Sequence, residues 1–201
     1  TIRRLMDRVG PADGDISPAL LDACRRGDRD ALGALYEAYK DRVYSIAFHY
    51  LHRDAAAAAD ATQQVFLKLI SQMARFRGDA AFSTWLYRLV VNVCLDRTRR
   101  GRSDRLSPQD PIVLDAVADP RPSHEDGLAR REVARTVHDA IDTLPPKLRL
   151  AILLRYFDDL SYEDMATALG CSIGTVSSRL SRGHRLLAGR LAPLRAAPIP
   201  K

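Results

Sequence analysis

Residues 160–187 read LSYEDMATALGCSIGTVSSRLSRGHRLL, and apolar residues at three- and four-residue spacing predict two helices in this stretch. Ser161 is placed to cap the first helix, and Gly170 is placed to end it. Ser172 is placed to cap the second helix, whose apolar face begins at Val176. A short helix, a tight turn and a longer helix in this order predict a helix-turn-helix.

The polar face of the second predicted helix carries small hydroxyl groups followed by cations. Its residues are Thr175, Ser178, Arg179, Arg182 and Arg185, and no Asp or Glu occurs from Ser172 to the last residue. Such a face suits the base edges and phosphates of duplex DNA. An ordinary amphipathic helix with a solvated basic face is the alternative interpretation of the same pattern.

The overall charge also favours a polyanionic partner. The chain has 201 residues, a formal net charge of +6 and 46% hydrophobic residues, and its pI is near 9.5. Five arginines lie between residues 97 and 105, whereas acidic residues gather around residues 115–126. We therefore expect one end of a folded unit to be strongly positive.

Cysteine and histidine positions give no support for a metal or a cofactor. Cys24, Cys94 and Cys171 are far apart and odd in number, which disfavours a disulfide framework or a zinc site and favours the cytoplasm. We expect Cys94 and Cys171 to be small buried hydrophobic residues. His49 and His52 lie one turn apart, but without a third ligand nearby we interpret them as a hydrated helix end. No segment approaches the roughly 18 apolar residues of a membrane span, so no membrane insertion is predicted.

Helical periodicity dominates on both sides of residues 101–123, a stretch that contains four prolines. The sequence predicts an all-α architecture of two helical domains, over residues 17–102 and 125–192, joined by a flexible linker over 103–124. A short helix is predicted after Ser17, and further helices are predicted over about 30–52, 55–73, 80–100, 125–143 and 147–157. The helix-turn-helix completes the second domain.

Four segments occur in a fixed order on the two sides of the linker: LGALYEAYKDRVYSIAFHYL, DATQQVFLKLI, FRGDAAFSTWLYRLVVNVCLDRTRR and LPPKLRLAILLRYFDDLSYEDMATALGCSIGTVSSRLSRGHRLL. Together they resemble a bacterial sigma factor of the extracytoplasmic-function (ECF) group over about residues 18–191. The resemblance implies a promoter-specificity subunit of RNA polymerase. Its first domain would bind the clamp of the largest polymerase subunit and melt the −10 element, and its second domain would read the −35 element as duplex DNA.

Melted DNA must be held as a single strand, which requires cations along its backbone and a pocket or an aromatic surface for an unstacked base. The segment MARFRGDAAFST (residues 73–84) supplies arginines beside an aromatic ring, a glycine for a tight turn and Asp79 to cap the next helix. We interpret Asn92 as a buried-face asparagine that a backbone group or a nucleobase must satisfy, and Trp85 as a core residue rather than a base platform. The resemblance implies strand contacts by Lys68, Gln72, Phe76, Arg77, Gly78, Asp79, Ala80, Phe82, Ser83, Arg88, Leu89 and Asn92.

For the second domain, the resemblance implies −35 contacts by a set of residues on the recognition helix and one on the helix before it. They are Arg149, Ser172, Gly174, Thr175, Ser177, Ser178, Arg179 and Arg182. Family members commonly carry Lys or Arg at the position of Ser177, where a cation could read guanine. A serine there predicts altered or weaker −35 discrimination.

The largest departure from the family pattern concerns polymerase binding. ECF sigma factors usually carry an acidic segment and a Thr-Gln-Glu motif that face the clamp, whereas this chain has alanines at 57–59, followed by Asp60, Thr62, Gln63 and Gln64. The resemblance assigns core binding to Asp60, Gln63 and Gln64. Because only one carboxylate remains among the expected acids, the electrostatic attraction to the clamp is expected to be weak. A phosphoryl group would add about 1.5 to 2 negative charges, so we hypothesise that a Ser/Thr kinase activates the chain at Thr62, in place of release from an anti-sigma factor. The alternative is that the alanines only strengthen the helix and other contacts compensate.

Two other classes of protein compete with this interpretation. A two-domain transcription regulator could bind duplex DNA on its own, with the first helices serving for dimerisation, but that leaves FRGDAAFSTWLYR without a purpose. An enzyme is not predicted, because no nucleophile with its base, no phosphate-binding loop and no metal triad is visible in the sequence.

Overall fold

The computed structural model describes residues 16–76, 78, 80–104 and 125–192, and every regular element in this part of the chain is helical. The elements are α1 (Pro18–Arg25), α2 (Arg29–Tyr50), α3 (Ala55–Gln72), the single 3₁₀ turn η2 (Met73–Arg75), α4 (Phe82–Asp104), α5 (Glu125–Asp142), α6 (Pro146–Phe157), α7 (Tyr162–Leu169) and α8 (Ile173–Arg190). The all-α prediction is confirmed for the described residues.

Serine side chains fix where three of the helices begin. Ser17, Ser161 and Ser172 cap α1, α7 and α8, each with a hydroxyl oxygen that accepts the backbone N–H three residues further on. All three caps were predicted from the sequence. The predicted cap of α4, Asp79, lies outside the described residues.

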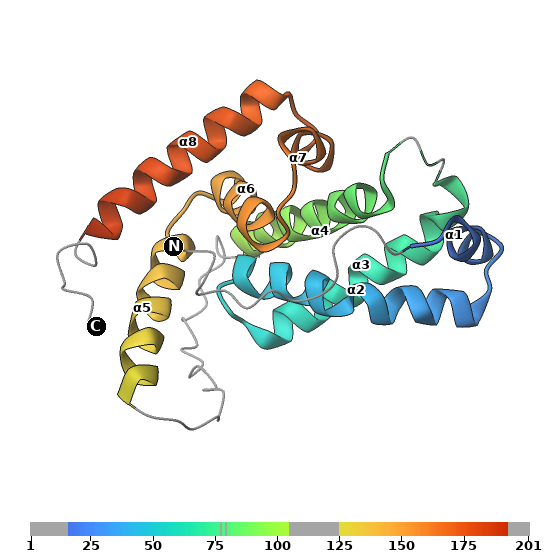
Figure 1. Cartoon of the computed structure of the whole chain (residues 1–201), viewed down its shortest axis with the longest axis horizontal. Helices are drawn as coiled ribbons and strands as arrows, with labels where there is room; N and C mark the ends of the chain where they lie inside the picture. Colours follow the sequence, from blue (N-terminus) through green and yellow to red (C-terminus); the bar gives the residue numbers. More distant parts are fainter. Residues whose placement is uncertain (1–15, 77, 79, 105–124, 193–201) are drawn as a thin grey trace.

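In the first half of the chain, α2, α3 and α4 pack together, with α1 against α2 and η2 (Figure 1). Their apolar residues recur at helical spacing, so each helix presents one stripe to a shared core. Fully buried side chains in this core include Leu35, Val43, Ile46, Ala61, Leu69, Leu86 and Val90.

In the second half, α6, α7 and α8 form the predicted helix-turn-helix domain. Gly170 ends α7 in the left-handed conformation, with a φ of 59°, which glycine adopts without strain. Fully buried side chains in this core include Leu150, Leu153, Met165 and Val176. The helix-turn-helix prediction is confirmed.

The two halves also pack against each other. Helix α7 lies on α4 and helix α6 lies on α2 (Figure 1), and the buried residues of both halves form one continuous core. The sequence did not predict this packing, because an apolar stripe does not say which helix covers it. The domain boundaries stay a prediction, and most of the predicted linker lies outside the described residues.

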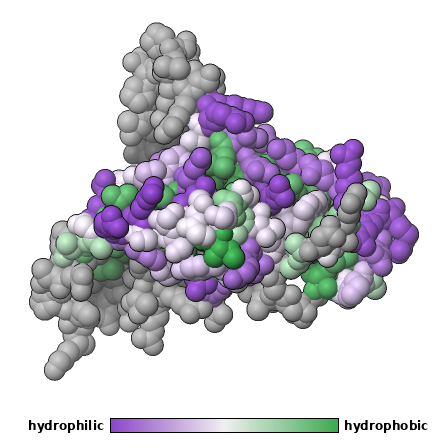
Figure 2. All heavy atoms as spheres, turned by 90° about the horizontal axis from the view of Figure 1, so that it is seen from above, coloured by the Kyte–Doolittle hydropathy of each residue, from purple (hydrophilic) through white to green (hydrophobic). Residues whose placement is uncertain are grey.

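Figure 2 views the molecule from above the orientation of Figure 1. Hydrophilic residues cover most of the described surface on that face, and apolar residues appear there as separate patches. Within the described residues, we find no helix with the length and apolar content to cross a membrane.

Candidate nucleic-acid interface

The recognition helix α8 presents its polar face to solvent. Ser172, Gly174, Ser177, Ser178 and Arg182 are exposed, whereas Thr175 and Arg179 are half-buried. The seven predicted contact residues of this helix, between Ser172 and Arg182, lie in or next to its N-terminal half. A recognition helix in the major groove contacts base edges with this part.

Local hydrogen bonds hold the start of α8 in place. Ser172 Oγ accepts the backbone N–H of Thr175 at 3.2 Å and lies 2.9 Å from Thr175 Oγ1. Ser178 Oγ donates to the Thr175 carbonyl at 3.0 Å, and Arg179 Nη1 lies 3.5 Å from Cys171 Sγ, across the turn. The half-buried Cys171 thus contacts the Arg179 guanidinium, so the prediction of a buried hydrophobic residue is wrong for Cys171.

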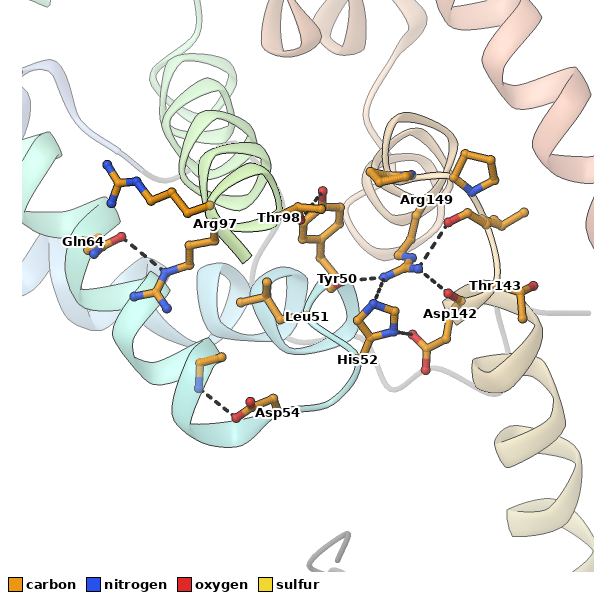
Figure 3. Close-up of a pocket in the computed structure, with 15 residues that line it drawn as sticks. Tyr50, Leu51, His52, Asp54, Gln64, Arg97, Thr98, Asp142, Thr143 and Arg149 are labelled. Atoms are coloured by element: carbon orange, nitrogen blue, oxygen red, sulfur yellow. Dashed lines mark hydrogen bonds and ion pairs between the residues drawn. The ribbon is translucent and has the colours of Figure 1, made fainter. Parts of the chain in front are cut away.

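Arg149 does not belong to this DNA-reading face, and that prediction is wrong for this structure. Its side chain is buried, with 5% of the residue exposed. Figure 3 shows its guanidinium surrounded by acceptors: it donates to the carbonyl oxygens of Tyr50 at 2.8 Å, Leu144 at 3.2 Å and Asp142. A guanidinium that closes the ends of two helices in this way is unavailable to a phosphate.

Three aromatic rings gather at the start of α4 beside a small cavity. The ring centroids of Phe76 and Trp85 lie 5.1 Å apart, those of Phe82 and Trp85 lie 5.8 Å apart, and Arg25 stacks over Phe76 at 5.3 Å. The adjoining cavity of about 390 Å³ is lined by Arg75, Phe76, Gly78, Ala80, Trp85, Arg88 and Thr167. Aromatic walls with arginines at the rim suit an unstacked base and its phosphates.

The interpretation of Asn92 as a buried residue is wrong, because its side chain is exposed. Helix α4 buries Leu89, Val90, Val91, Val93 and Cys94, and it leaves a polar stripe that carries Arg88 and Asn92 four residues apart. A polar residue within an apolar helical run can still face solvent, because successive residues point to different sides of the helix. Asn92 therefore needs no protein partner and stays available to a strand.

The other predicted strand contacts fall into four groups: exposed, half-buried, buried and outside the described residues. Gly78 and Arg88 are exposed, and Lys68, Gln72 and Ala80 are half-buried. Phe76, Phe82, Ser83 and Leu89 are buried, so Ser83 and Leu89 in particular serve the core of α4 and cannot face a strand in this conformation. Arg77 and Asp79 lie outside the described residues.

Trp85 and Thr167 belong to the cavity, although neither was predicted to contact DNA. Trp85 is half-buried, so it serves as both core residue and cavity wall. Thr167 comes from α7 in the second half of the chain, and no sequence signal could have placed it there.

The predicted polymerase-binding residues Asp60, Gln63 and Gln64 are exposed on α3. Arg97 from α4 donates to Gln64 Oε1 at 3.3 Å and lies 3.7 Å from Asp60, which offsets part of the remaining negative charge. Two large apolar side chains follow on the same helix: Leu67 is 67% exposed and Ile70 is 52% exposed. Sequence reasoning missed both, although apolar residues on a second stripe of α3 were the available signal.

Thr62 is buried, with 7% of the residue exposed, and its hydroxyl donates to the Ala58 carbonyl at 2.8 Å. A kinase must reach the hydroxyl oxygen, and a phosphoryl group would not fit between α3 and the core. The structure therefore contradicts phosphorylation of Thr62 in this fold.

His49 is half-buried, so the expectation of a hydrated helix end is wrong for this residue. Its ring centroid lies 4.8 Å from that of His138 on α5 and 4.6 Å from that of Phe157 on α6. Burial, with a smaller effect of His138, lowers the pKa of His49 to about 4. His52 is exposed and lies 3.0 Å from Arg149 Nη1. Among the described residues, no three His, Cys, Asp or Glu side chains are placed to hold a metal ion.

Cys94 is fully buried in the core, and burial raises the pKa of its thiol to about 12. A thiol of this kind stays protonated and unreactive. The prediction of a small buried hydrophobic residue is confirmed for Cys94.

Comparisons with known proteins agree with both halves of this arrangement. The Sigma-70 region 2 family model matches residues 35–103, and the Sigma-70 region 4 model matches residues 134–187. The RNA polymerase sigma-H factor of Pseudomonas aeruginosa is 36% identical over 182 residues, which cover 87% of this chain and 93% of that protein. The ECF RNA polymerase sigma-E factor of Escherichia coli is 32% identical over 87% of this chain and 94% of that protein.

Two solved structures share the fold. CnrH in complex with the cytosolic domain of CnrY has a TM-score of 0.63 and 22% identity, over 87% of this chain and 96% of that chain. The sigma factor RpoE in complex with the anti-sigma factor NepR from Bartonella quintana has a TM-score of 0.65 and 24% identity, over 80% and 96%. The fold and the two matched regions are those of a sigma factor. The sequence relatives are more specific, and the chain belongs to the ECF sigma factors.

Proposed function

We propose that this chain binds core RNA polymerase and directs initiation at specific promoters, as a non-catalytic subunit that works in the cytoplasm. The observation that carries the proposal is the pairing of two separate DNA-facing sites in one chain. One is an exposed recognition helix, and the other is an aromatic cavity with arginines at its rim. A regulator that binds only duplex DNA has use for the first site and none for the second.

The −35 element would be read by α8. Ser178 and Thr175 lie toward the N-terminal end of the helix, where short side chains allow the backbone to approach base edges, and Arg182 lies further along, where a phosphate contact is expected. The exposed Ser177 has no charge to offer guanine. Discrimination would therefore depend on hydroxyl contacts and groove fit.

The melted −10 strand would follow the polar stripe of α4. Arg88 and Asn92 are exposed on this stripe, and Arg88 also lines the cavity beside Trp85. A base that leaves the stack can enter the cavity between aromatic rings while Arg75 and Arg88 hold the neighbouring phosphates.

The polymerase clamp would contact α3 through a surface that is more apolar than the sequence indicated. Asp60, Gln63 and Gln64 precede the exposed Leu67 and Ile70. Burying two large aliphatic side chains stabilises a complex by about 1.5–3 kcal/mol each if burial is complete. This contribution replaces part of the attraction that the missing carboxylates would provide.

A partner protein is the best supported form of control, since the Thr62 hydroxyl is inaccessible. Two proteins of similar fold were solved in complex with a partner: CnrH with the cytosolic domain of CnrY, and the sigma factor RpoE with the anti-sigma factor NepR. We propose that an anti-sigma factor binds this chain as well. The domain boundaries at residues 17–102 and 125–192 are part of the same proposal.

Transcription in vitro with purified core polymerase tests the function. A sigma factor added to core alone directs run-off transcription from a matching promoter in a library, whereas a duplex-binding regulator yields transcripts only with a pre-existing holoenzyme. Absence of initiation across the library, together with specific binding to duplex DNA by the free chain, would favour the regulator.

A further inference from the structure

We propose that Arg25 on α1 is a positioning residue of the −10 site, the aromatic cavity at the start of α4. It would hold one wall of the cavity and the adjoining backbone in place for an unstacked base. The inference rests on the proposed function for what the cavity binds, whereas the contacts of Arg25 can be tested without DNA. Helix α1 precedes residues 35–103, which match Sigma-70 region 2, and Arg25 is not among the strand contacts that the resemblance implies.

Helix α1 lies at the end of the helical bundle where α3 is followed by η2 (Figure 1). It packs on α2 and on η2, with Cys24 buried in its last turn. Arg25 is the last residue of the helix and is half-buried, whereas the next residue, Arg26, is exposed. The end of α1 therefore places one of two consecutive arginines beside the residues that follow η2.

The Arg25 guanidinium makes contacts on three sides. Its Nη1 lies 2.7 Å from Asp22 Oδ1, one turn earlier in α1, and its Cζ lies 5.3 Å from the centre of the Phe76 ring. Its Nη2 would stand 3.7 Å from a methyl group on the Cα of Gly78. One guanidinium thus joins α1 to two residues that line the cavity.

Packing, more than hydrogen bonding, sets the position of this guanidinium. Arg25 Nε is buried and has no hydrogen-bond partner among the described residues. The Asp22 side chain is 56% exposed, and ion pairs with such exposed groups stabilise little. A guanidinium stacked over an aromatic ring is held by the electrons of the ring and by dispersion. Arg25 and Phe76 therefore each restrict the orientation of the other.

Phe76 is the cavity wall that this contact holds. The residue is 8% exposed, and its ring centroid lies 5.1 Å from that of Trp85 and 5.7 Å from that of Phe82. Arg25 thus packs on a ring that also packs against two other aromatic rings. Phe76 and Trp85 line the cavity and Arg25 does not, so Arg25 would act on a bound base through Phe76 and not by touching the base.

Gly78 is the second cavity residue beside Arg25. Its φ is 79°, a left-handed conformation that residues with a side chain rarely adopt. Because the guanidinium stands next to this turn, it limits how far the Gly78 backbone can move toward α1. Arg25 therefore restricts both the aromatic wall and the backbone of the cavity.

Loss of Arg25 should make the cavity less selective. Without the guanidinium, the Phe76 ring loses its contact on the α1 side and can tilt away from the position that fits a base. A cation–π contact of this kind corresponds to about a two- to fivefold change in an equilibrium constant. The preference for the matched base over a mismatched one should fall by about this factor, while Arg75 and Arg88 remain at the cavity to hold phosphates.

Arg25→Ala removes the guanidinium, and Arg26→Ala, which removes an equal charge at the exposed neighbouring position, is the matched control. The first readout is acrylamide quenching of Trp85, the only tryptophan, in the free chain. Acrylamide is uncharged, so quenching reports access to the ring and not the lost charge. We expect stronger quenching in Arg25→Ala and wild-type quenching in Arg26→Ala. Arg25→Lys keeps the charge without the planar group and should give an intermediate value, which also keeps the test valid if Arg25→Ala does not fold.

The second readout is the affinity of the holoenzyme for single-stranded −10 oligonucleotides, which come from a promoter that initiates in the run-off library and carry each base in turn at the unstacked position. We expect Arg25→Ala to reduce the base preference about two- to fivefold at an unchanged salt slope. A salt slope lower by about one unit would indicate a direct phosphate contact and would overturn the positioning role. Unchanged quenching of Trp85 in both Arg25 variants would overturn it as well.

The two readouts separate this inference from the proposed function. If the wild type does not initiate with core polymerase, the proposed function fails, and the −10 role of Arg25 fails with it. Quenching of Trp85 needs neither promoter nor polymerase, so it still decides whether Arg25 holds Phe76. If the wild type initiates and quenching does not change, the proposed function stands and only the role of Arg25 is refuted.

Discussion

Gly183 in the recognition helix lies so close to Ile152 in α6 that a methyl group on its Cα would stand 3.0 Å from Ile152 Cγ1. An approach of 3.0 Å is tighter than nine in ten real contacts of this kind, so the Ile152 side chain or α8 must move by a few tenths of an ångström if residue 183 gains a side chain. The position of the exposed polar face of α8 thus depends on the contact between Gly183 and Ile152 on the opposite face.

Gly183→Ala should therefore reduce stability by about 1–3 kcal/mol through overpacking, and it should weaken −35 binding because α8 is displaced. Gly189→Ala is the control, since nothing lies within 4 Å of its added methyl group. Thermal unfolding and duplex binding measure the two effects. A Gly183→Ala protein as stable as the control would show that α6 accommodates the methyl group.

Asn92→Ala should impair open-complex formation while leaving core binding intact, because Asn92 is exposed on the polar stripe of α4 that we propose follows the strand, whereas the proposed polymerase contacts lie on α3. Permanganate footprinting of the −10 region with reconstituted holoenzyme measures melting. Asp41→Ala, at an exposed position of α2, is the control. Equal melting by both variants would remove Asn92 from the strand contact.

Arg182→Ala should weaken binding to all −35 variants nearly equally and lower the salt slope by about one unit, because a phosphate contact carries no sequence information. Ser178→Ala should change sequence preference with little change in salt slope. Binding to a set of −35 duplexes at several salt concentrations measures both. If both variants lose selectivity equally, the division between phosphate and base contacts is wrong.

Leu67→Ala should weaken core binding about tenfold or more without lowering the stability of the free chain. Leu67 is 67% exposed in the free chain, so its side chain would make most of its contacts only in the complex. Ala59→Glu should strengthen core binding, because it restores a carboxylate at an exposed position of the depleted motif. Affinity for purified core measures both. Unchanged affinity of Leu67→Ala would move the polymerase contact away from this surface.

Acid should destabilise the chain partly through His49. Its pKa is lowered to about 4 in the folded chain and returns to about 6.5 on unfolding, so the unfolded chain binds more protons between these values. Stability should therefore fall as the pH falls from about 6.5 to about 4, by on the order of 2–3 kcal/mol. Denaturant unfolding of wild type and His49→Phe measures this slope. The variant should show a shallower loss over that range.

Local rules predicted the elements of this fold well. Ser17, Ser161 and Ser172 cap their helices and Gly170 ends α7, since capping depends on residues only a few positions apart. The polar face of α8 was likewise visible in the sequence, because helical periodicity alone determines it.

The predictions that proved wrong concerned burial and contacts between residues that are distant in sequence. Arg149 was expected to contact DNA and is buried against Tyr50. Thr62 was expected to be a site of phosphorylation, and its hydroxyl is buried and bonded to Ala58. The prediction for Asn92 was wrong in the opposite direction: it was expected to be buried, and its side chain is exposed on a stripe of α4. Thr167 lines the aromatic cavity only because two halves that are separate in sequence pack together.

The packing of the two halves against each other limits how freely they can be exchanged. Arg42 and Tyr87 in one half and Asp158 in the other form one hydrogen-bonded unit, so a chimera that takes its helix-turn-helix from a relative would have to bring a compatible partner for Arg42. Promoter specificity in this chain is consequently less modular than its two matched regions imply. A graft of a new −35 reader should be confined to the exposed face of α8 and should leave the turn between α6 and α7 untouched.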